Sequence, residues 1–125
     1  MSESLPRVLM VEADAIQRDL IALALSRLNV SVFTTGSAQQ VEAHLLAHRP
    51  DLMLLDVYLP QTNGLELLRQ LKSKGLLGKT AVIVLSSLGF QEVVEQAVQA
   101  GALYFMVKPV DTDLLVKRVR EILKI

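Results

Sequence analysis

The sequence predicts an α/β fold in which helices cover both faces of a parallel, doubly wound, five-stranded sheet. Short apolar runs alternate five times with segments whose apolar residues recur at helical spacing, which is the pattern of successive βα units. Four of these runs are almost continuously apolar, as strands buried on both faces are. The chain of 125 residues has the usual length of one domain, and we expect residues 1–125 to form it.

The first two units are recognised from their helix starts. The first run, residues 8–11, leads into a helix that Asp14 can cap, because its carboxylate can accept hydrogen bonds from unpaired amides. The second run, residues 30–35, precedes Ser37 and Gln40, which are spaced as a capping box. The residues expected to face inward on these two helices are Ile16, Leu20, Leu23, Ala24 and Leu28, then Ala38, Val41 and Leu45.

The third unit begins after Pro50, since the residue before a proline avoids helical angles. Its strand covers residues 52–55, and a turn-rich loop at residues 59–64 separates that strand from the next helix. The residues expected on the buried side of this helix are Leu65, Leu68 and Leu71. The loop contains proline, asparagine and glycine, so it marks a sharp change of direction at the end of the third strand.

The last two units follow the same order. Strands are expected at about residues 80–85 and 103–107, and the helix between them should end at Gly101, which suits a left-handed cap. Asp111 or Thr112 can cap the final helix. The residues expected to face inward on these two helices are Phe90, Val93, Val94, Ala97 and Val98, then Leu115, Val119 and Ile122.

Composition excludes several classes of protein. Thirteen basic residues balance thirteen acidic ones, so we expect no direct binding of nucleic acid by this segment. The absence of cysteine excludes disulfides and thiolate metal sites. Residues 1–4 carry an acid where an export signal carries positive charge, and no apolar stretch approaches the roughly 20 residues of a membrane span. We therefore expect a soluble, cytoplasmic protein with no membrane contact.

Four of the apolar runs end at a chemically capable side chain: Glu12, Asp56, Ser86 and Lys108. Ligands of parallel sheets bind at the carboxyl ends of the strands, so these four groups should meet in one cleft. A carboxylate nucleophile, a second acid, a hydroxyl and an ammonium are the groups that metal-assisted phosphoryl transfer requires. The sequence therefore predicts a phosphoryl-transfer site at this edge of the sheet.

The chain resembles the receiver domain of bacterial two-component response regulators over nearly its whole length. The resemblance rests on an acid after the first strand, Asp56 after the third, Ser86 after the fourth and Lys108-Pro109 after the fifth. Pro60 and Asn63-Gly64 in the loop after Asp56 add to it. The resemblance implies a flavodoxin-like (βα)5 fold with strand order 2-1-3-4-5. It also implies a cis peptide bond before Pro109.

In such a domain Asp56 would be the phosphoacceptor, taking a phosphoryl group from a histidine kinase or a histidine phosphotransfer protein. Lys108 and Ser86 would contact the phosphoryl oxygens, and Ser86 and Phe105 would form the switch. The resemblance implies a Mg²⁺ ion held by Glu12, Asp56 and the backbone carbonyl of Tyr58. It further implies a signalling domain rather than an enzyme with its own substrate. Its partners would be a downstream effector protein or a fused output domain, with a homodimer as a further candidate assembly.

The sequence departs from the family pattern at Ala13, where a second acid usually coordinates the metal directly. Alanine offers no ligand, so we expect weak Mg²⁺ binding in which Glu12 acts through water and Asp14 is a further candidate ligand. A second interpretation follows from the same position. The chain would then be a degenerate receiver that binds proteins without being phosphorylated, although Asp56, Ser86 and Lys108 argue against this.

Two apolar features of the sequence each allow two interpretations. Tyr58, two residues after Asp56, could shield an acyl phosphate from water or could simply cover the cleft, and Leu88 lies correspondingly after Ser86. The first helix also carries more apolar residues than one stripe requires, including Ile21, Ala22 and Leu25. This excess would be core coverage or, as in the family, a docking surface for the phosphodonor.

Overall fold

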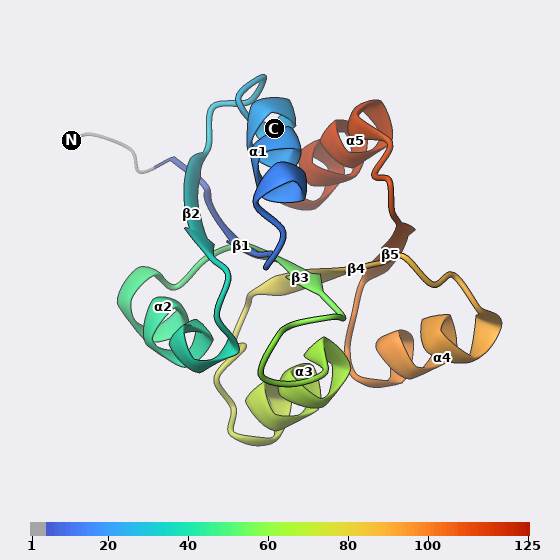
Figure 1. The fold of residues 1–125 in the computed structure, drawn as a ribbon. Helices are drawn as coiled ribbons and strands as arrows, with labels where there is room; N and C mark the ends of the chain where they lie inside the picture. The colour runs from blue at the N-terminus through green and yellow to red at the C-terminus, as the bar shows by residue number, and fades with distance from the viewer. Residues whose placement is uncertain (1–4) are drawn as a thin grey trace.

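Five strands alternate with five helices in the computed structural model, which describes residues 5–125 (Figure 1). The strands are β1 (Arg7–Val11), β2 (Ser31–Thr35), β3 (Leu52–Asp56), β4 (Ala81–Ser86) and β5 (Tyr104–Val107). The helices are α1 (Ala15–Leu25), α2 (Val41–His48), α3 (Gly64–Ser73), α4 (Gln91–Gln99) and α5 (Thr112–Leu123), and a short 3-10 helix (Ala38–Gln40) precedes α2. The expectation about an export signal concerns residues 1–4, which lie outside the described residues.

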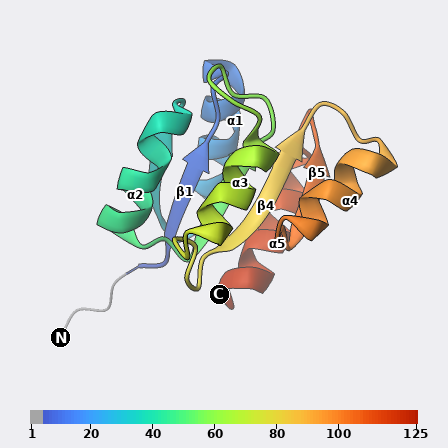
Figure 2. The ribbon, with the colours of Figure 1, turned by 90° about the horizontal axis from the view of Figure 1, so that it is seen from below.

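All strand pairs are parallel, and the strand order is β2-β1-β3-β4-β5. The order and the α/β class predicted above are therefore confirmed. The sheet is the middle layer of three: α1 and α5 cover one face, and α2, α3 and α4 cover the other (Figures 1 and 2). Within residues 5–125, no helix is both long enough and apolar enough to cross a membrane.

The central strands are buried because helices cover them on both sides. Every residue of 8–11 and of 52–55 has no exposed surface. Alternate side chains of these strands enter two separate apolar clusters, one between the sheet and α2, α3 and α4, the other between the sheet and α1 and α5. Burial of this apolar surface, at about 25 cal/mol per Å², is the main force that holds the layers together.

Two helices begin at the predicted capping side chains, and a third ends near the predicted glycine. Asp14 accepts hydrogen bonds from the first turn of α1, and Asp111 accepts one from the amide of Leu114 in α5. Gly101, after α4, has φ of +109°, a conformation that favours glycine. The capping box predicted for Ser37 and Gln40 is wrong, because Ser37 makes no side-chain cap and a 3-10 turn precedes α2.

The buried stripe predicted for α1 is partly wrong. Ile16 is 78% exposed and Leu23 is 70% exposed, whereas Ile21 and Leu25 are fully buried. The buried side of α1 is formed by Ile21, Ala24, Leu25 and Leu28. Both sides of this helix are apolar in sequence, so periodicity alone chose the wrong one for its first half. The excess residues Ile21, Ala22 and Leu25 are therefore core coverage, and the solvent-facing apolar residues are Ile16 and Leu23, which were expected to face inward.

The prediction for α4 is also wrong at its two ends. Phe90 is 65% exposed and Val98 is 58% exposed, whereas Ala97 is fully buried and Val93 is half-buried. The helix lies near β5, the edge strand of the sheet (Figure 1). The inward sets predicted for α2 and α3 are buried, and Leu115 and Val119 of α5 are buried too.

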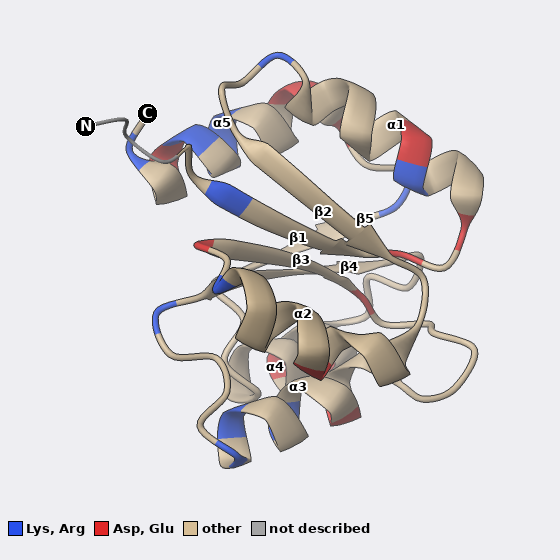
Figure 3. Ribbon diagram, turned by 90° about the vertical axis from the view of Figure 1, so that its left-hand side faces the viewer, with Lys and Arg blue, Asp and Glu red and all other residues tan. Residues whose placement is uncertain are grey.

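Acidic residues lie near the N-termini of several helices, and basic residues lie near the C-termini of some. Glu42, Glu66, Glu92 and Asp113 lie in first helical turns, and last turns carry Lys72 or other basic residues. Acidic side chains near helix N-termini and basic ones near C-termini complement the helix dipoles. Basic residues consequently gather toward the edge at which strands begin, although the total charge is zero (Figure 3).

Candidate phosphoryl-transfer site

Asp56 ends β3, the middle strand of the sheet, and only 4% of its surface is exposed. One carboxylate oxygen, Oδ1, accepts a hydrogen bond of 3.1 Å from the backbone amide of Tyr58. The other, Oδ2, lies 3.0 Å from Nζ of Lys108. Both oxygens are therefore oriented by the protein, and the carboxylate lies at the edge of the sheet where parallel-sheet ligands bind.

Lys108 joins the two acids. It follows β5, its backbone amide donates to the carbonyl of Ser86 at 2.8 Å, and its ammonium contacts the carboxylates of both Glu12 and Asp56. Glu12, directly after β1, has no exposed surface. The structure thus brings Glu12, Asp56 and Lys108 together from three strands that are far apart in sequence. Their chemical roles stay predictions.

Glu12 is in an environment that disfavours its charge. Burial, followed by the neighbouring Asp56 carboxyl, raises the pKa of Glu12 from 4.5 to about 7, although Lys108 partly opposes this rise. Its Oε1 pairs with Lys108, whereas its buried Oε2 has no hydrogen-bond partner. An unsatisfied buried oxygen costs free energy, so this atom is available to a proton, a water molecule or a cation.

Ser86 is fully buried at the end of β4, and its hydroxyl oxygen accepts a hydrogen bond of 3.0 Å from the amide of Leu88. Phe105 lies in β5 and packs, partly buried, against the apolar cluster beneath α3 and α4. Tyr104 faces the opposite side, where the Arg118 guanidinium lies 4.8 Å above its ring. The two neighbouring aromatics therefore face opposite sides of the sheet.

Asp14 and Tyr58 lie at the margin of the site. The Oδ1 atom of Asp14 accepts from the amides of Ile16 and Gln17 at 2.8 and 3.2 Å, so this carboxylate is engaged in capping α1. Tyr58 is 49% exposed, and its backbone pairs with Asn63 across the loop that follows β3. Its ring therefore borders the site without being part of the core.

Gly64 is a residue whose importance for the site sequence reasoning missed. A Cβ atom placed on it would lie 2.1 Å from the carbonyl oxygen of Asp56, a distance that no real contact allows. The Gly64 amide donates to the carbonyl of Val57 at 2.6 Å, and Asn63 caps α3 through the amide of Leu65. Glycine thus lets the start of α3 touch the end of β3. The Asn-Gly pair was a signal for the turn but not for this close approach.

The oxygen donors at this edge fit a weakly held magnesium ion. Among residues 5–125, no group of three His, Cys, Asp or Glu side chains is placed to hold a metal. Mg²⁺ nevertheless often binds proteins through one or two carboxylates and keeps several waters. The Asp56 carboxylate and the unpartnered Oε2 of Glu12 are donors of this kind, and the Tyr58 carbonyl stays a predicted ligand. The Ala13 side chain offers no ligand.

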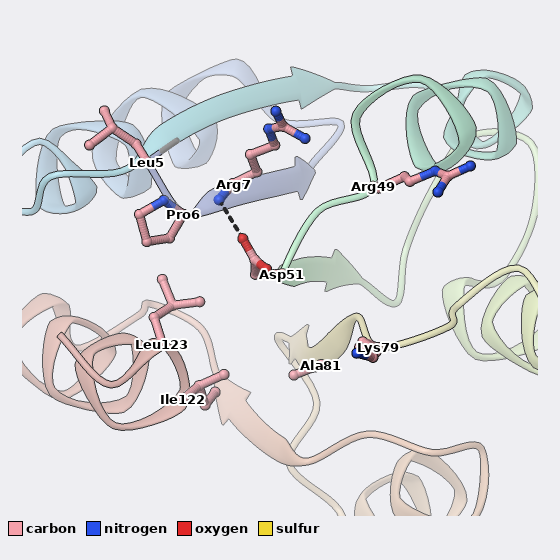
Figure 4. A pocket seen from close by; sticks show the side chains of 9 residues that line it. All are labelled: Leu5, Pro6, Arg7, Arg49, Asp51, Lys79, Ala81, Ile122 and Leu123. Carbon is pink, nitrogen blue, oxygen red and sulfur yellow. Dashed lines mark hydrogen bonds between the residues drawn. The ribbon is translucent and has the colours of Figure 1, made fainter. Parts of the chain in front are cut away.

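A pocket at the opposite edge of the sheet serves the fold rather than this site. Figure 4 shows that the Asp51 carboxylate accepts a hydrogen bond of 2.8 Å from the backbone amide of Arg7. The backbone amide of Asp51 donates in turn to the Arg7 carbonyl, also at 2.8 Å. The guanidinium of Arg49 points away from the centre of the pocket (Figure 4). The basic side chains there do not converge on one point, and Asp51 ties the beginnings of β1 and β3 together.

The doubly wound sheet with buried acids and a lysine at its carboxyl edge defines a class of protein, the phosphoryl-accepting signalling domains. Residues 8–120 match the family model of the response regulator receiver domain. The chain therefore belongs to the response regulator receiver domain family. Receiver domains act in two-component signalling, where phosphoryl transfer is their general function.

Individual relatives agree with this assignment. The chain is 33% identical over 117 residues to the phosphate regulon transcriptional regulatory protein PhoB of Pseudomonas aeruginosa, which covers 94% of this chain and 51% of that protein. The chain thus spans about half the length of this curated relative. It is 27% identical to a CheY-like receiver domain protein from Methanospirillum hungatei, with a TM-score of 0.87 and coverage of 97% and 95% of the two chains. A response regulator from Thermotoga maritima is 26% identical, with a TM-score of 0.85 and coverage of 97% and 99%.

Proposed function

We propose that Asp56 accepts a phosphoryl group from a histidine kinase or a histidine phosphotransfer protein, and that its phosphorylation switches a protein-interaction face. The observation that carries this proposal is the environment of the Asp56 carboxylate. It is buried, oriented by the Tyr58 amide at one oxygen and held 3.0 Å from the Lys108 ammonium at the other. A carboxylate so fixed has little to reorganise when it attacks phosphorus.

In this reaction an Asp56 oxygen forms a bond to phosphorus while the bond from phosphorus to the donor's histidine nitrogen breaks. The nitrogen keeps the electron pair of that bond. Lys108 then contacts an oxygen of the transferred group as a positive point charge, and the Ser86 hydroxyl donates a hydrogen bond to another. A bound Mg²⁺ would supply charge neutralisation, held by Asp56, the Tyr58 carbonyl and, directly or through water, Glu12.

The switch would involve Ser86 and Phe105. Ser86 uses its hydroxyl oxygen as an acceptor from the Leu88 amide, which leaves its proton free to donate to a phosphoryl oxygen. Movement of Ser86 toward that group would open space for Phe105, which is only partly buried. Phe105 has no hydroxyl, so its outward state exposes apolar surface without a compensating hydrogen bond. We therefore propose that the inward state dominates after phosphorylation.

The exposed apolar stripe of α1 fits a helical phosphodonor. The stripe consists of three residues of α1 at intervals of four and three positions: Ile16, Leu20 and Leu23. They are 78%, 36% and 70% exposed, respectively. This spacing places them on one face, where they can pack into the groove of a partner's helices. The helix starts directly beside Glu12, so a donor docked on this stripe lies next to Asp56. The output would pass to a downstream effector or a fused output domain.

A degenerate receiver that acts only by binding proteins is the second candidate function. Ala13 favours it, because a direct metal ligand is missing. Both candidates use the same interaction faces. They differ in whether Asp56 ever carries a phosphoryl group.

Intact-mass spectrometry after incubation with acetyl phosphate and Mg²⁺ separates the two candidates. The proposed function predicts one phosphoryl adduct on the wild type, its loss in Asp56→Asn and its retention in Asp19→Asn, an exposed aspartate of α1. Absence of an adduct from wild type, while the donor phosphorylates another receiver domain in the same buffer, would support the degenerate receiver. An adduct that persists in Asp56→Asn would show that another residue is the acceptor.

The magnesium proposal has its own test in Ala13→Asp. Restoring a second acid should tighten Mg²⁺ binding about 10-fold or more, because added anionic ligands raise affinity for a hard cation. Quenching of Tyr58 fluorescence during Mg²⁺ titration measures this, with Tyr58→Phe as the control for the signal. Equal affinities for wild type and Ala13→Asp would refute the proposal that position 13 limits metal binding.

A further inference from the structure

Arg18 reaches from α1 back to the loop that carries Glu12. Its Nη1 donates to the carbonyl oxygen of Glu12 at 2.7 Å and lies 3.4 Å from that of Ala13. Side chains of a helix lean toward its N-terminus, which directs this arginine to the start of α1. The guanidinium is partly buried, and no ion pair to it is present among the described residues. Its contacts in the loop are therefore backbone carbonyls.

The space for this guanidinium exists because position 36 is glycine. A Cβ on Gly36 would lie 2.9 Å from Nη1 of Arg18 and 3.4 Å from the Glu12 carbonyl oxygen. The Gly36 backbone thus lies against both the guanidinium and the loop that carries Glu12 and Ala13. Next to it, the amide of Glu12 donates to the carbonyl of Thr35 at 3.0 Å. The backbone of Glu12 is therefore held at both its amide and its carbonyl.

This anchoring matters because the side chain at position 13 makes only apolar contacts with the core and offers the loop no polar anchor. The Ala13 side chain cannot bind a metal or accept a hydrogen bond, and Asp14 is engaged in capping α1. The direction of the Glu12 carboxylate, which meets Lys108, is consequently set through the Glu12 backbone. An atom displaced by about 1 Å can slow a reaction about 100-fold, so a backbone anchor here affects the chemistry directly.

We propose that Arg18 is a positioning residue of the phosphoryl-transfer site: it fixes the loop between β1 and α1 and thereby holds the Glu12 carboxylate against Lys108. This inference rests on the function proposed for Asp56. Arg18 touches none of the reacting atoms and acts through Glu12. A guanidinium suits the task because Nη1 carries two N–H donors in a fixed plane and reaches both carbonyls, which a lysine ammonium on a shorter stem does not reproduce.

The test compares Arg18→Lys and Gly36→Ala with Arg27→Lys, a matched control on an exposed arginine just past the end of the same helix. Arg18→Lys should slow phosphorylation by acetyl phosphate about 10-fold or more, as loss of an outer-shell partner typically does. Amide hydrogen exchange at Glu12 should accelerate by a similar factor, and the melting temperature should change little. Gly36→Ala, which displaces the guanidinium without removing it, should have the same effects, and Arg27→Lys should have none.

The double variant gives the decisive comparison. If Arg18 and Gly36 act through one contact, the double variant should be no slower than the slower single variant. Unchanged phosphorylation in Arg18→Lys, or losses that simply add in the double variant, would overturn the inference. If the wild type takes no phosphoryl group, the function proposed for Asp56 fails. Amide exchange at Glu12 then still tests the role of Arg18, because exchange that is unaltered by Arg18→Lys refutes that role. If Gly36→Ala does not fold, Arg18→Lys alone is decisive.

Discussion

The raised pKa of Glu12 predicts that the stability of the metal-free protein depends on pH. In the unfolded chain this carboxyl titrates near 4.5, whereas burial and the Asp56 carboxyl raise its pKa to about 7 in the folded protein. Between these values the folded state binds more protons than the unfolded state, so the free energy of unfolding falls as pH rises. The loss begins above pH 4.5 and is complete above about pH 7.

The expected size of this effect follows from the pKa itself. Each pKa unit corresponds to about 1.4 kcal/mol, so a rise from 4.5 to about 7 corresponds to a loss on the order of 3 kcal/mol. Glu12→Gln keeps the size of the side chain and removes its titration. The variant should therefore lack this part of the pH dependence, while the contributions of all other groups remain.

Urea unfolding followed by circular dichroism at pH 5 and pH 8, in a chelator, measures the difference. The wild type should lose more free energy of unfolding between these two pH values than Glu12→Gln does, by up to about 3 kcal/mol. Glu42→Gln, which removes an exposed carboxylate that pairs with Lys74, is the control and should follow wild type. Equal pH dependence in wild type and Glu12→Gln, or a steeper loss in the variant, would refute this reasoning.

Three further predictions concern other parts of the site. Gly64→Ala should lower the free energy of unfolding, measured by urea titration, by about 2 kcal/mol or more, because the new Cβ would lie 2.1 Å from the Asp56 carbonyl oxygen. A loss below about 0.5 kcal/mol would mean that the loop moves to accommodate the Cβ at little cost. Tyr58→Asn should shorten the lifetime of the phosphorylated protein, since the ring would no longer shield the acyl phosphate, and an unchanged lifetime would leave Tyr58 as cover only. Leu23→Asp should weaken the binding of a cognate phosphodonor about 5-fold or more, measured by titration calorimetry, and should leave phosphorylation by acetyl phosphate unaffected. Unchanged affinity for the donor would exclude the α1 stripe as its docking surface.

The order of the elements followed from the sequence because each strand and helix has a local signal of its own. Continuous apolar runs indicated buried strands, and Asp14 and Asp111 marked helix starts that the structure confirms. The gathering of strand ends at one edge followed from parallel topology, so the meeting of Glu12 with Lys108 could be expected without coordinates.

Other features could not be predicted, because they depend on distances between elements. Both sides of α1 are apolar, so only packing against α5 decides that Ile21 is buried and Ile16 is exposed. Gly64 looked like an ordinary turn residue, and its contact with Asp56 arises from how closely α3 approaches β3. Arg18 belongs to no sequence motif, yet it binds a carbonyl six positions earlier in the chain.

The site draws its groups from parts of the sheet that differ in rigidity. Glu12 and Asp56 follow β1 and β3, inner strands whose residues 8–11 and 52–55 have no exposed surface. Lys108 instead follows β5, a four-residue edge strand in which Val107 is 48% exposed. Segments with little burial open at lower free energy than the core of a sheet. From this difference in burial we expect the ammonium to withdraw more readily than the two acids, with the lysine as the movable member of the site and the carboxylates as its frame.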